Sequence, residues 1–322
     1  NKIRIMKKKK IVVVGGGTGT YTVLSGLKTY PVELTAIVSM ADDGGSSGVL
    51  REEFGILPTG DVRRALVALS SYPEKFLADL FTYRFHEGGI NGHNFGNLIL
   101  TALERVTGSF EKAVAAASRL LDVRGTVLPV TFSNVRLFAE LENGEIIKGE
   151  TNIDIPKHDG RLRITRVWLK PKAKGNARAI RAIRDADMIV VGPGDLFTSI
   201  VPNFLAGGIS DAMRKSNAKK VYITNLMTKH GETNGFSGAD FLSTLHQYIG
   251  AHVFDFVVVN RGRPLAPILQ RYKKEQAEWI SYKDMMYKKK AKPCVITASL
   301  LRRGTYVRHD PAKLAKVIMN IV

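Results

Sequence analysis

The sequence has few of the features that mark secreted, membrane or metal-cluster proteins. Its 322 residues include a single cysteine, Cys294. One thiol excludes an internal disulfide and a metal cluster held by thiolates, and such sparse cysteine usage is typical of a cytoplasmic protein. No apolar run approaches the roughly 18 residues that suggest a membrane span. Internal repeats and low-complexity linkers are also absent, so we expect a single α/β domain over residues 1–322.

Several familiar cofactor and catalytic motifs are absent as well. The segment IVVVGGGTGTYTVLSGL, residues 11–27, ends an apolar run in three glycines. It does not match G-x-G-x-x-G, because Thr20 or Thr22 stands where the last glycine belongs, and no Gly-Lys-Ser/Thr follows as in a P-loop. The segment GGSSG, residues 44–48, fits the spacing G-x-S-x-G, but we interpret it as part of a flexible polar loop and do not expect a Ser-His-Asp hydrolase. The glycines therefore indicate either close approach to an anion or a tight turn that packs a strand against a helix.

Basic residues outnumber acidic ones. The chain has 48 Lys and Arg against 29 Asp and Glu, a net charge of +19. Six of these basic residues lie in residues 1–10, and we expect residues 1–9 to be a tag or upstream tail, with Met6 as the natural start. Further clusters lie at 288–290 and 302–303. A basic surface can attract nucleic acid or anionic ligands. Because no nucleic-acid motif accompanies the charge, we interpret it as a solvated surface and expect no nucleic-acid partner.

Short runs of β-branched residues alternate with helical patterns along most of the chain. This rhythm predicts a Rossmann-like three-layer α/β sandwich with a mostly parallel sheet. The pattern changes near Arg124, where strict alternation and the turn signals ENGE and HDGR appear. These features predict an inserted antiparallel β-hairpin region over residues 126–170.

The ends of the predicted strands carry small, polar or acidic residues. In open α/β sheets, ligands bind beyond the carboxyl ends of the strands. The sequence therefore predicts one shared cleft at these ends. The residues concerned are Gly15–Thr18, Asp42–Asp43, Gly192–Asp195, Asn225 and Asn260.

Two adjacent carboxylates open the polar loop ADDGGSSG. Asp42 and Asp43 suit a hard cation beside a diphosphate, or the orientation of a hydroxyl nucleophile, although an Asx turn or a helix cap would explain them too. Asp61 is interpreted as the N-cap of the next helix, and Arg63 and Arg64 as surface residues. One arginine facing the cleft would suit a phosphate.

Two further motifs suggest anion binding. Asn94 and Asn97 in GHNFGNLIL lie at the start of a predicted helix, where exposed amides favour a negative charge. GPGDLFTS, residues 192–199, is a second glycine loop between a strand and a helix. Together with the glycines at residues 15–19, this gives two glycine loops on one sheet, which fit a diphosphate or two anionic substrates.

Taken together, these motifs resemble one family. The segments that carry the resemblance are VVVGGGTG, TAIVSMADDGGSSGVLREEFGILPTGDVRRALVAL, GHNFGNLILTAL, VRGTVLPVT, ADMIVVGPGDLFTSIVPNFL, KKVYITNLMTKHGETNGF and VRHDPAKLA. In order and spacing they are similar to the YvcK branch of the CofD-like superfamily, also called the gluconeogenesis factor family. The resemblance covers residues 10–322 and implies a Rossmann-like fold with an inserted hairpin region.

The resemblance implies a cytoplasmic regulator that binds UDP-N-acetylglucosamine and is linked to cell shape and carbon metabolism, without a settled reaction. The alternative is a CofD-type transferase, which joins phospholactate from a guanosine-diphosphate-activated donor to a deazaflavin hydroxyl with a divalent cation. In that case Asp42 and Asp43 would be catalytic and would hold Mg²⁺. We expect no tightly bound cofactor, a UDP-sugar or another nucleoside diphosphate as ligand, and, from the family alone, a homodimer.

The strand-end rule and the resemblance together give a set of ligand-binding residues. Tyr272 would stack on uracil and Arg308 would pair with phosphate. The sequence departs from the family at Asp195, usually serine, and at Lys229-His230, usually a more neutral pair. It also departs at Arg261 and Arg263, where the branch is less basic. An extra carboxylate repels a diphosphate unless a cation intervenes. The full set is Gly15, Gly16, Gly17, Thr18, Gly19, Asn94, Asn97, Gly192, Pro193, Gly194, Asp195, Ser199, Asn225, Asn260, Tyr272 and Arg308.

Overall fold

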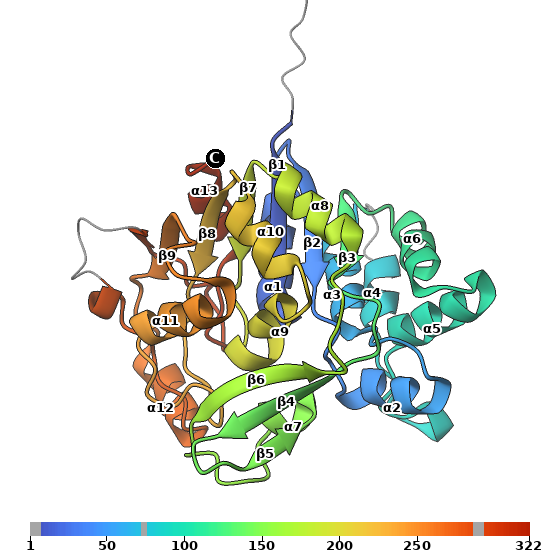
Figure 1. Cartoon of the computed structure of the whole chain (residues 1–322), viewed down its shortest axis with the longest axis horizontal. Coiled ribbons are helices and arrows are strands. Elements are labelled where there is room, and N and C mark those ends of the chain that lie inside the picture. Colours follow the sequence, from blue (N-terminus) through green and yellow to red (C-terminus); the bar gives the residue numbers. More distant parts are fainter. Residues whose placement is uncertain (1–7, 72–75, 286–292) are drawn as a thin grey trace, which may run out of the picture.

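A seven-stranded sheet forms the centre of the molecule (Figure 1). The computed structural model describes residues 8–71, 76–285 and 293–322. The strand order is β10-β9-β8-β7-β1-β2-β3, and each pairing is parallel. The strands are β1(Lys10–Gly15), β2(Glu33–Val38), β3(Thr126–Pro129), β7(Met188–Val191), β8(Lys219–Ile223), β9(Phe256–Asn260) and β10(Cys294–Ala298).

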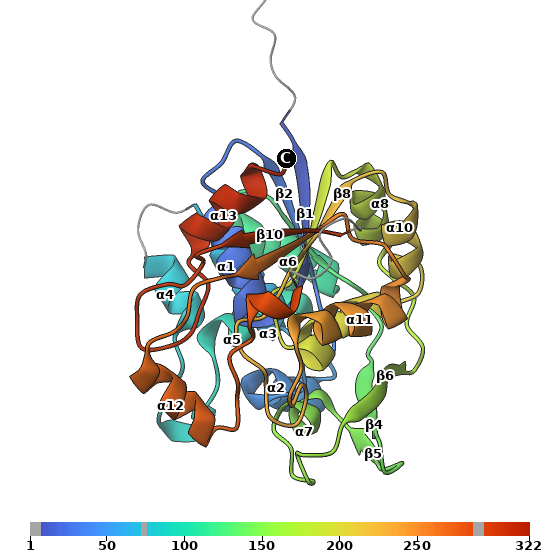
Figure 2. The ribbon, with the colours of Figure 1, turned by 90° about the vertical axis from the view of Figure 1, so that its left-hand side faces the viewer.

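Helices cover both faces of this sheet. Figure 2 shows α1(Gly17–Leu27) and α13(Pro311–Met319) on one side, and α8(Ala177–Asp185) and α10(Ile209–Lys215) on the other. Residues 11–14 of β1 are buried from both sides, as their continuous apolar run requires. The predicted three-layer α/β sandwich is confirmed.

The strand order reverses at β1. From there the chain adds β2 and β3 on one side, and β7 to β10 on the other. Ligands of open α/β sheets bind in the crevice at such a reversal, outside the carboxyl ends of the strands. The ends of β1 and β7 therefore mark where a site is expected, and both end in glycine-rich loops.

The other helices surround these strand ends or extend the layers. α3 begins at Gly60 with Thr59 as its N-cap, so Asp61 lies inside the helix and does not cap it, contrary to our expectation. A single π-helical turn, η2(Leu196–Ile200), follows β7, and such turns are frequent at functional sites. The remaining helices are α2(Gly45–Phe54), α3(Gly60–Leu69), α4(Phe76–Thr82), α5(Phe95–Thr107), α6(Phe110–Leu120), α9(Val201–Phe204), α11(Gly238–Ile249) and α12(Ala266–Lys274), with 3₁₀ turns at Gly88–Ile90 and Tyr282–Met285.

A small antiparallel sheet lies below the carboxyl ends of the main sheet (Figure 1). It has the order β5-β4-β6, from β4(Arg136–Leu141), β5(Ile146–Lys148) and β6(Ile164–Lys170), with the short helix α7(Glu150–Asp154). We expected this region over 126–170. Because β3 pairs in parallel with β2, it belongs to the main sheet, and the antiparallel part begins at Arg136.

Two charge features of the sequence fall outside the described residues. Residues 1–7, most of the expected tail, and the basic cluster at 288–290 are among them. Within the described ranges, none of the helices combines the length and the apolar character that crossing a membrane would require.

Candidate functional site

The two glycine loops at the strand reversal pack directly against each other. A methyl group on Gly19, in the first turn of α1, would lie 2.0 Å from the carbonyl oxygen of Pro193. Asn225 fixes the second loop, because its Nδ2 donates to the Gly194 carbonyl at 2.9 Å and its Oδ1 accepts from the Gly194 amide at 3.4 Å. The loops thus form a rigid wall, and two cavities lie beside it.

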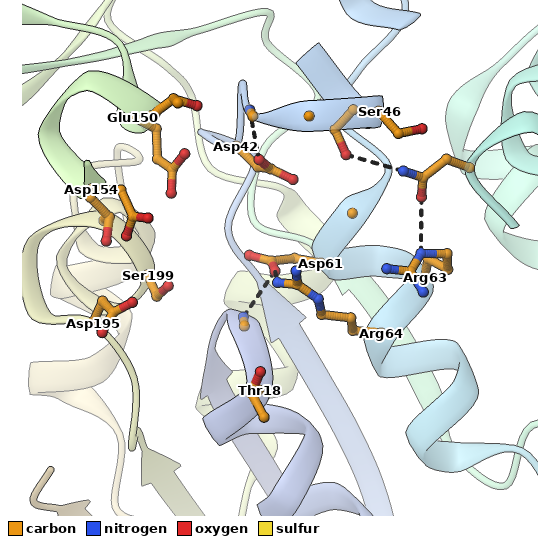
Figure 3. A pocket seen from close by; sticks show the side chains of 18 of the residues that line it. Thr18, Asp42, Ser46, Asp61, Arg63, Arg64, Glu150, Asp154, Asp195 and Ser199 are labelled. Carbon is orange, nitrogen blue, oxygen red and sulfur yellow. Dashed lines mark hydrogen bonds and ion pairs between the residues drawn. The ribbon is translucent and has the colours of Figure 1, made fainter. Parts of the chain in front are cut away.

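The first cavity has a volume of about 380 Å³ and a polar lining (Figure 3). It lies between the ends of β1 and β2, the start of α3, and α7 of the inserted region. Carboxylates from these elements point into it, and arginines of α3 lie along one side. The charged residues of the lining are Asp42, Asp61, Arg63, Arg64, Arg84, Glu150, Asp154 and Asp195.

Glycines make room for two of these carboxylates. A methyl group on Gly16 would lie 2.3 Å from Asp61 Oδ2, and one on Gly60 would lie 2.3 Å from Asp42 Oδ2. Asp61 Oδ1 accepts a hydrogen bond from the Gly17 amide at 2.9 Å. The first backbone amide of α1, which has no partner within the helix, is therefore bound to a carboxylate. The next amides of that turn are left for a ligand.

The carboxylates raise one another's pKa. Burial, and next to it the charge of Asp61, raises the pKa of Asp42. Burial raises the pKa of Glu150 to about 9, and the carboxylates of Asp42 and Asp154 add to the effect. Glu150 is therefore neutral at pH 7 and can donate a hydrogen bond, or bind a cation by releasing its proton. Strongly raised carboxyl pKa values in a cleft are typical of functional sites.

Two arginine side chains of the first cavity are held in place by neighbouring residues. Arg63 is buried, and its Nε donates to Asn97 Oδ1 at 3.0 Å. Burial lowers its pKa to about 10, which still leaves it charged at pH 7. Arg64 pairs with Asp61 at 3.3 Å across one helical turn. A fixed guanidinium at a cavity wall suits a phosphate or a carboxylate.

The second cavity is larger, about 800 Å³, and lies between the second glycine loop, the segment after β8, and α12. Tyr272 and Arg308 both line it, although they are 36 positions apart in the sequence. The Tyr272 hydroxyl accepts from the Val307 amide at 3.1 Å, which fixes the ring. His309 is buried beside them, and burial lowers its pKa to about 4, so this imidazole is neutral at pH 7.

The two cavities share Thr18, Ile155 and Asp195 in their linings. At this junction the Asp195 carboxylate, which the sequence marks as unusual, has a cation beside it. Lys229 Nζ lies 3.0 Å from Asp195 Oδ2. Two residues that we expect to differ from the family pattern, Asp195 and Lys229, thus form an ion pair.

Most of the expected ligand-binding residues line one of the two cavities. Gly17, Asn97 and Ser199 line the first, Thr18 and Asp195 line both, and the metal candidate Asp42 lines the first. Six others line only the second cavity: Gly19, Pro193, Gly194, Asn225, Tyr272 and Arg308.

Six expected residues are in neither lining. Asp43 is turned away, because its carboxylate accepts from the amides of Glu150 at 3.2 Å and Thr151 at 2.9 Å and so caps α7. Asn94 caps α5, and Asn260 bonds to the backbone of its own loop and of Leu300. The other three are Gly15, Gly16 and Gly192, whose contacts shape the loops.

Six charged residues of the first cavity are not in the set expected from the sequence: Asp61, Arg63, Arg64, Arg84, Glu150 and Asp154. Asp61 does not cap its helix but accepts from the Gly17 amide, and Arg63 is buried and donates to Asn97, contrary to our expectation of a surface residue. Glu150 was not singled out, because α7 reaches the cavity only when the inserted sheet docks. The short polar sequence GETNID after a strand gives no separate signal.

Comparisons with known proteins agree over nearly the whole chain. A family model described as 2-phospho-L-lactate transferase CofD matches residues 11–301. The gluconeogenesis factor of Halalkalibacterium halodurans is 43% identical over 318 residues, 98% of this chain and 97% of that protein. The gluconeogenesis factor of Bacillus subtilis is 41% identical over 318 residues, 98% and 99% of the two chains.

A solved structure shows the same fold. The crystal structure of a member of the upf0052 family from Bacillus halodurans has a TM-score of 0.91 and 42% sequence identity, and covers 98% of this chain and 99% of that one. The likeness therefore extends over nearly the whole of both chains.

Proposed function

Because this chain belongs to the CofD family and is similar along its length to gluconeogenesis factors, we propose that it binds UDP-N-acetylglucosamine across the two cavities. The observation that carries the proposal is the junction. A polar cavity and a larger, more apolar one meet at a glycine-loop wall, at the reversal of the sheet. Nucleotides with a diphosphate bind at this position in related α/β architectures.

Each part of the ligand has a matching surface. The uridine occupies the second cavity, with its base against Tyr272 and its nearer phosphate facing Arg308. The diphosphate lies at the junction, where Thr18 and the first-turn amides of α1 donate hydrogen bonds. The sugar enters the first cavity, whose hydroxyl and amide groups, from Ser46, Ser199 and others, suit a polyhydroxylated ring.

The charge distribution favours an anionic ligand at the second cavity. The described residues of the C-terminal segment, 261–285 and 293–322, contain eleven Lys and Arg against four Asp and Glu. This segment supplies α12 and the loop around Arg308, both at the second cavity. Basic residues on the elements around a cavity raise the local concentration of anions and speed their association.

We propose that the protein is a regulator, which binds this nucleotide sugar according to its concentration and thereby affects cell shape and carbon metabolism. We propose that it does so in the cytoplasm, a compartment in which proteins with few cysteines and no disulfide are common.

Titration calorimetry tests the binding. We expect UDP-N-acetylglucosamine to bind at one site per chain, more tightly than UDP, GDP or ATP. Arg308→Ala should weaken binding at least tenfold, since it removes a charge-assisted contact. Arg302→Ala, an exposed arginine outside both linings, is the matched control and should keep the affinity. Absence of binding at millimolar ligand, or equal losses in the two variants, would contradict the proposal.

A second candidate, a CofD-type transferase, is favoured by the acidic wall of the first cavity. Asp42 and Asp61 both face this cavity, and the donor set of two carboxylates fits a divalent cation such as Mg²⁺. Such a cation would neutralise the diphosphate of an activated donor. Asp42 would hold it, whereas Asp43 is bound to the amides of α7.

Product formation from a guanosine-diphosphate-activated phospholactate donor and a deazaflavin tests this candidate. Turnover that Asp42→Asn lowers at least a hundredfold, while Asp43→Asn lowers it less, would support the transferase. Turnover that survives Asp42→Asn unchanged would rule out the assigned role.

A further inference from the structure

Lys229 lies among three carboxylates in an arrangement that resembles a metal site. Its Nζ is 3.0 Å from Asp195 Oδ2 and 3.3 Å from Glu232 Oε1, and it also pairs with Asp154. One oxygen of each carboxylate lies within 4.8 Å of the others, a spacing that could hold a metal ion. The ammonium group occupies the place of the cation.

The three carboxylates come from separate parts of the fold. Asp154 ends α7 of the inserted region, Asp195 lies in the loop after β7, and Glu232 follows β8. Glu232 is fully buried, and it accepts from the Phe197 amide and the Thr198 hydroxyl, both at 3.0 Å. The lysine therefore joins the inserted region to the π-helical turn and to the segment after β8.

This cluster sits where the two cavities meet. Asp154 lines the first cavity, Lys229 lines the second, and Asp195 lines both. A diphosphate that runs from one cavity to the other must pass the carboxylates of Asp154 and Asp195. Without a positive charge at this point, the like charges would repel each other.

The ammonium remains charged in this setting. Burial alone lowers the pKa of Lys229, but the carboxylates of Glu232, Asp195 and Asp154 outweigh burial, so the pKa is raised above its ordinary value. Burial raises the pKa of Glu232 to about 7, against the lowering effect of Lys229. Loss of the lysine would leave the carboxylates facing one another without a counter-charge.

We propose that the Lys229 ammonium takes the place of a divalent cation at the junction of the two cavities. It allows a nucleoside diphosphate to lie beside Asp154 and Asp195 without a metal ion at this point, and it fixes the inserted region against the second glycine loop. The part that concerns the nucleotide rests on the proposed function. The part that concerns the cation does not.

Manganese binding tests the cation part without any nucleotide. Lys229→Met keeps an unbranched side chain only one atom shorter and removes its charge. We expect this variant to bind one more Mn²⁺ per chain than the unaltered protein in titration calorimetry. Adding Asp154→Asn should remove the extra site, and Lys229→Arg, which keeps the charge, should not create it. An equal number of Mn²⁺ ions in the unaltered protein and in Lys229→Met would overturn the proposal.

If Lys229→Met folds poorly, its thermal stability with and without Mn²⁺ tests the cation part. If the ammonium replaces a cation, 1 mM Mn²⁺ should restore the variant's folding, or raise its melting temperature by several degrees more than that of the unaltered protein. A variant that stays unfolded, or gains no more than the unaltered protein, would count against the proposal.

Nucleotide affinity tests the remaining part. The ratio of UDP-N-acetylglucosamine affinity in Mg²⁺ to that in EDTA should be at least tenfold larger for Lys229→Met than for the unaltered protein. Equal ratios would overturn the role in ligand binding. If the unaltered protein binds no nucleotide, the proposed function fails, and the Mn²⁺ titration still decides the role of Lys229.

Discussion

Replacing Glu150 by glutamine should make the protein more stable at neutral pH. Glu150 carries a raised pKa of about 9, because it is buried beside Asp42 and Asp154. In the unfolded chain its pKa returns to about 4.5. At pH 7 the folded state thus holds a proton that the unfolded state releases, which favours unfolding. Glutamine has the same shape and no proton to hold.

The size of the effect follows from the pKa shift. A shift costs about 1.4 kcal/mol per pH unit between the unfolded pKa and the working pH, which sets a limit of about 3 kcal/mol at pH 7. Because the side chain still reaches water in the cavity, we expect about 2 kcal/mol. A raised folded pKa leaves stability intact below pH 4.5 and lowers it progressively as the pH rises toward 9. Glu150→Gln should therefore match the unaltered protein at pH 4 and exceed it increasingly above pH 5.

Urea unfolding at pH 4, 5.5, 7 and 8.5 measures this difference in the free energy of unfolding. Glu145→Gln, in an exposed turn of the inserted sheet, is the control and should leave the pH profile unchanged. A Glu150→Gln variant that is less stable at pH 7, or whose gain is the same at pH 4 and pH 7, would refute the account of the first cavity.

Two further predictions concern residues around the cavities. Burial lowers the pKa of His309 to about 4, so the free energy of unfolding should fall by about 3 kcal/mol as the pH drops from 6.5 to 4. In urea unfolding, His309→Gln should flatten this fall. The exposed control His86→Gln should not. Gly16→Ala should lower the free energy of unfolding by about 1–3 kcal/mol, because its methyl group would lie 2.3 Å from Asp61 Oδ2. The control Gly89→Ala, with no atom within 4 Å of the new methyl group, should lower it by less than about 1 kcal/mol. Removing Asp61 in the Gly16→Ala background should recover most of the loss, and full additivity in that double-mutant cycle would disprove the contact.

The sequence predicted the layers of the fold because periodicity and glycine-rich strand ends are local signals. The roles of individual glycines were not local. Gly16 accommodates Asp61, and Gly19 accommodates the Pro193 carbonyl. Both partners are distant in the chain, so the sequence left open whether the glycines face an anion or the protein.

The same limit applies to the polar residues. The strand-end rule placed Asn260 correctly at the carboxyl end of its strand, but its side chain bonds to the neighbouring loop. The rule fixes where a backbone ends, whereas the rotamer depends on tertiary contacts. Glu150 and Asp154 reach the first cavity only through docking of the inserted sheet, which no spacing in the sequence indicates.

A crystal structure with UDP-N-acetylglucosamine would test the central claim most directly. We expect one ligand that spans both cavities, with uracil against Tyr272, the diphosphate between Thr18 and the Gly194–Asp195 loop, and the sugar in the first cavity. Lys229 should remain within ion-pair distance of Asp195, with no metal ion between them. A ligand confined to another surface, or a diphosphate placed away from the two glycine loops, would contradict the account.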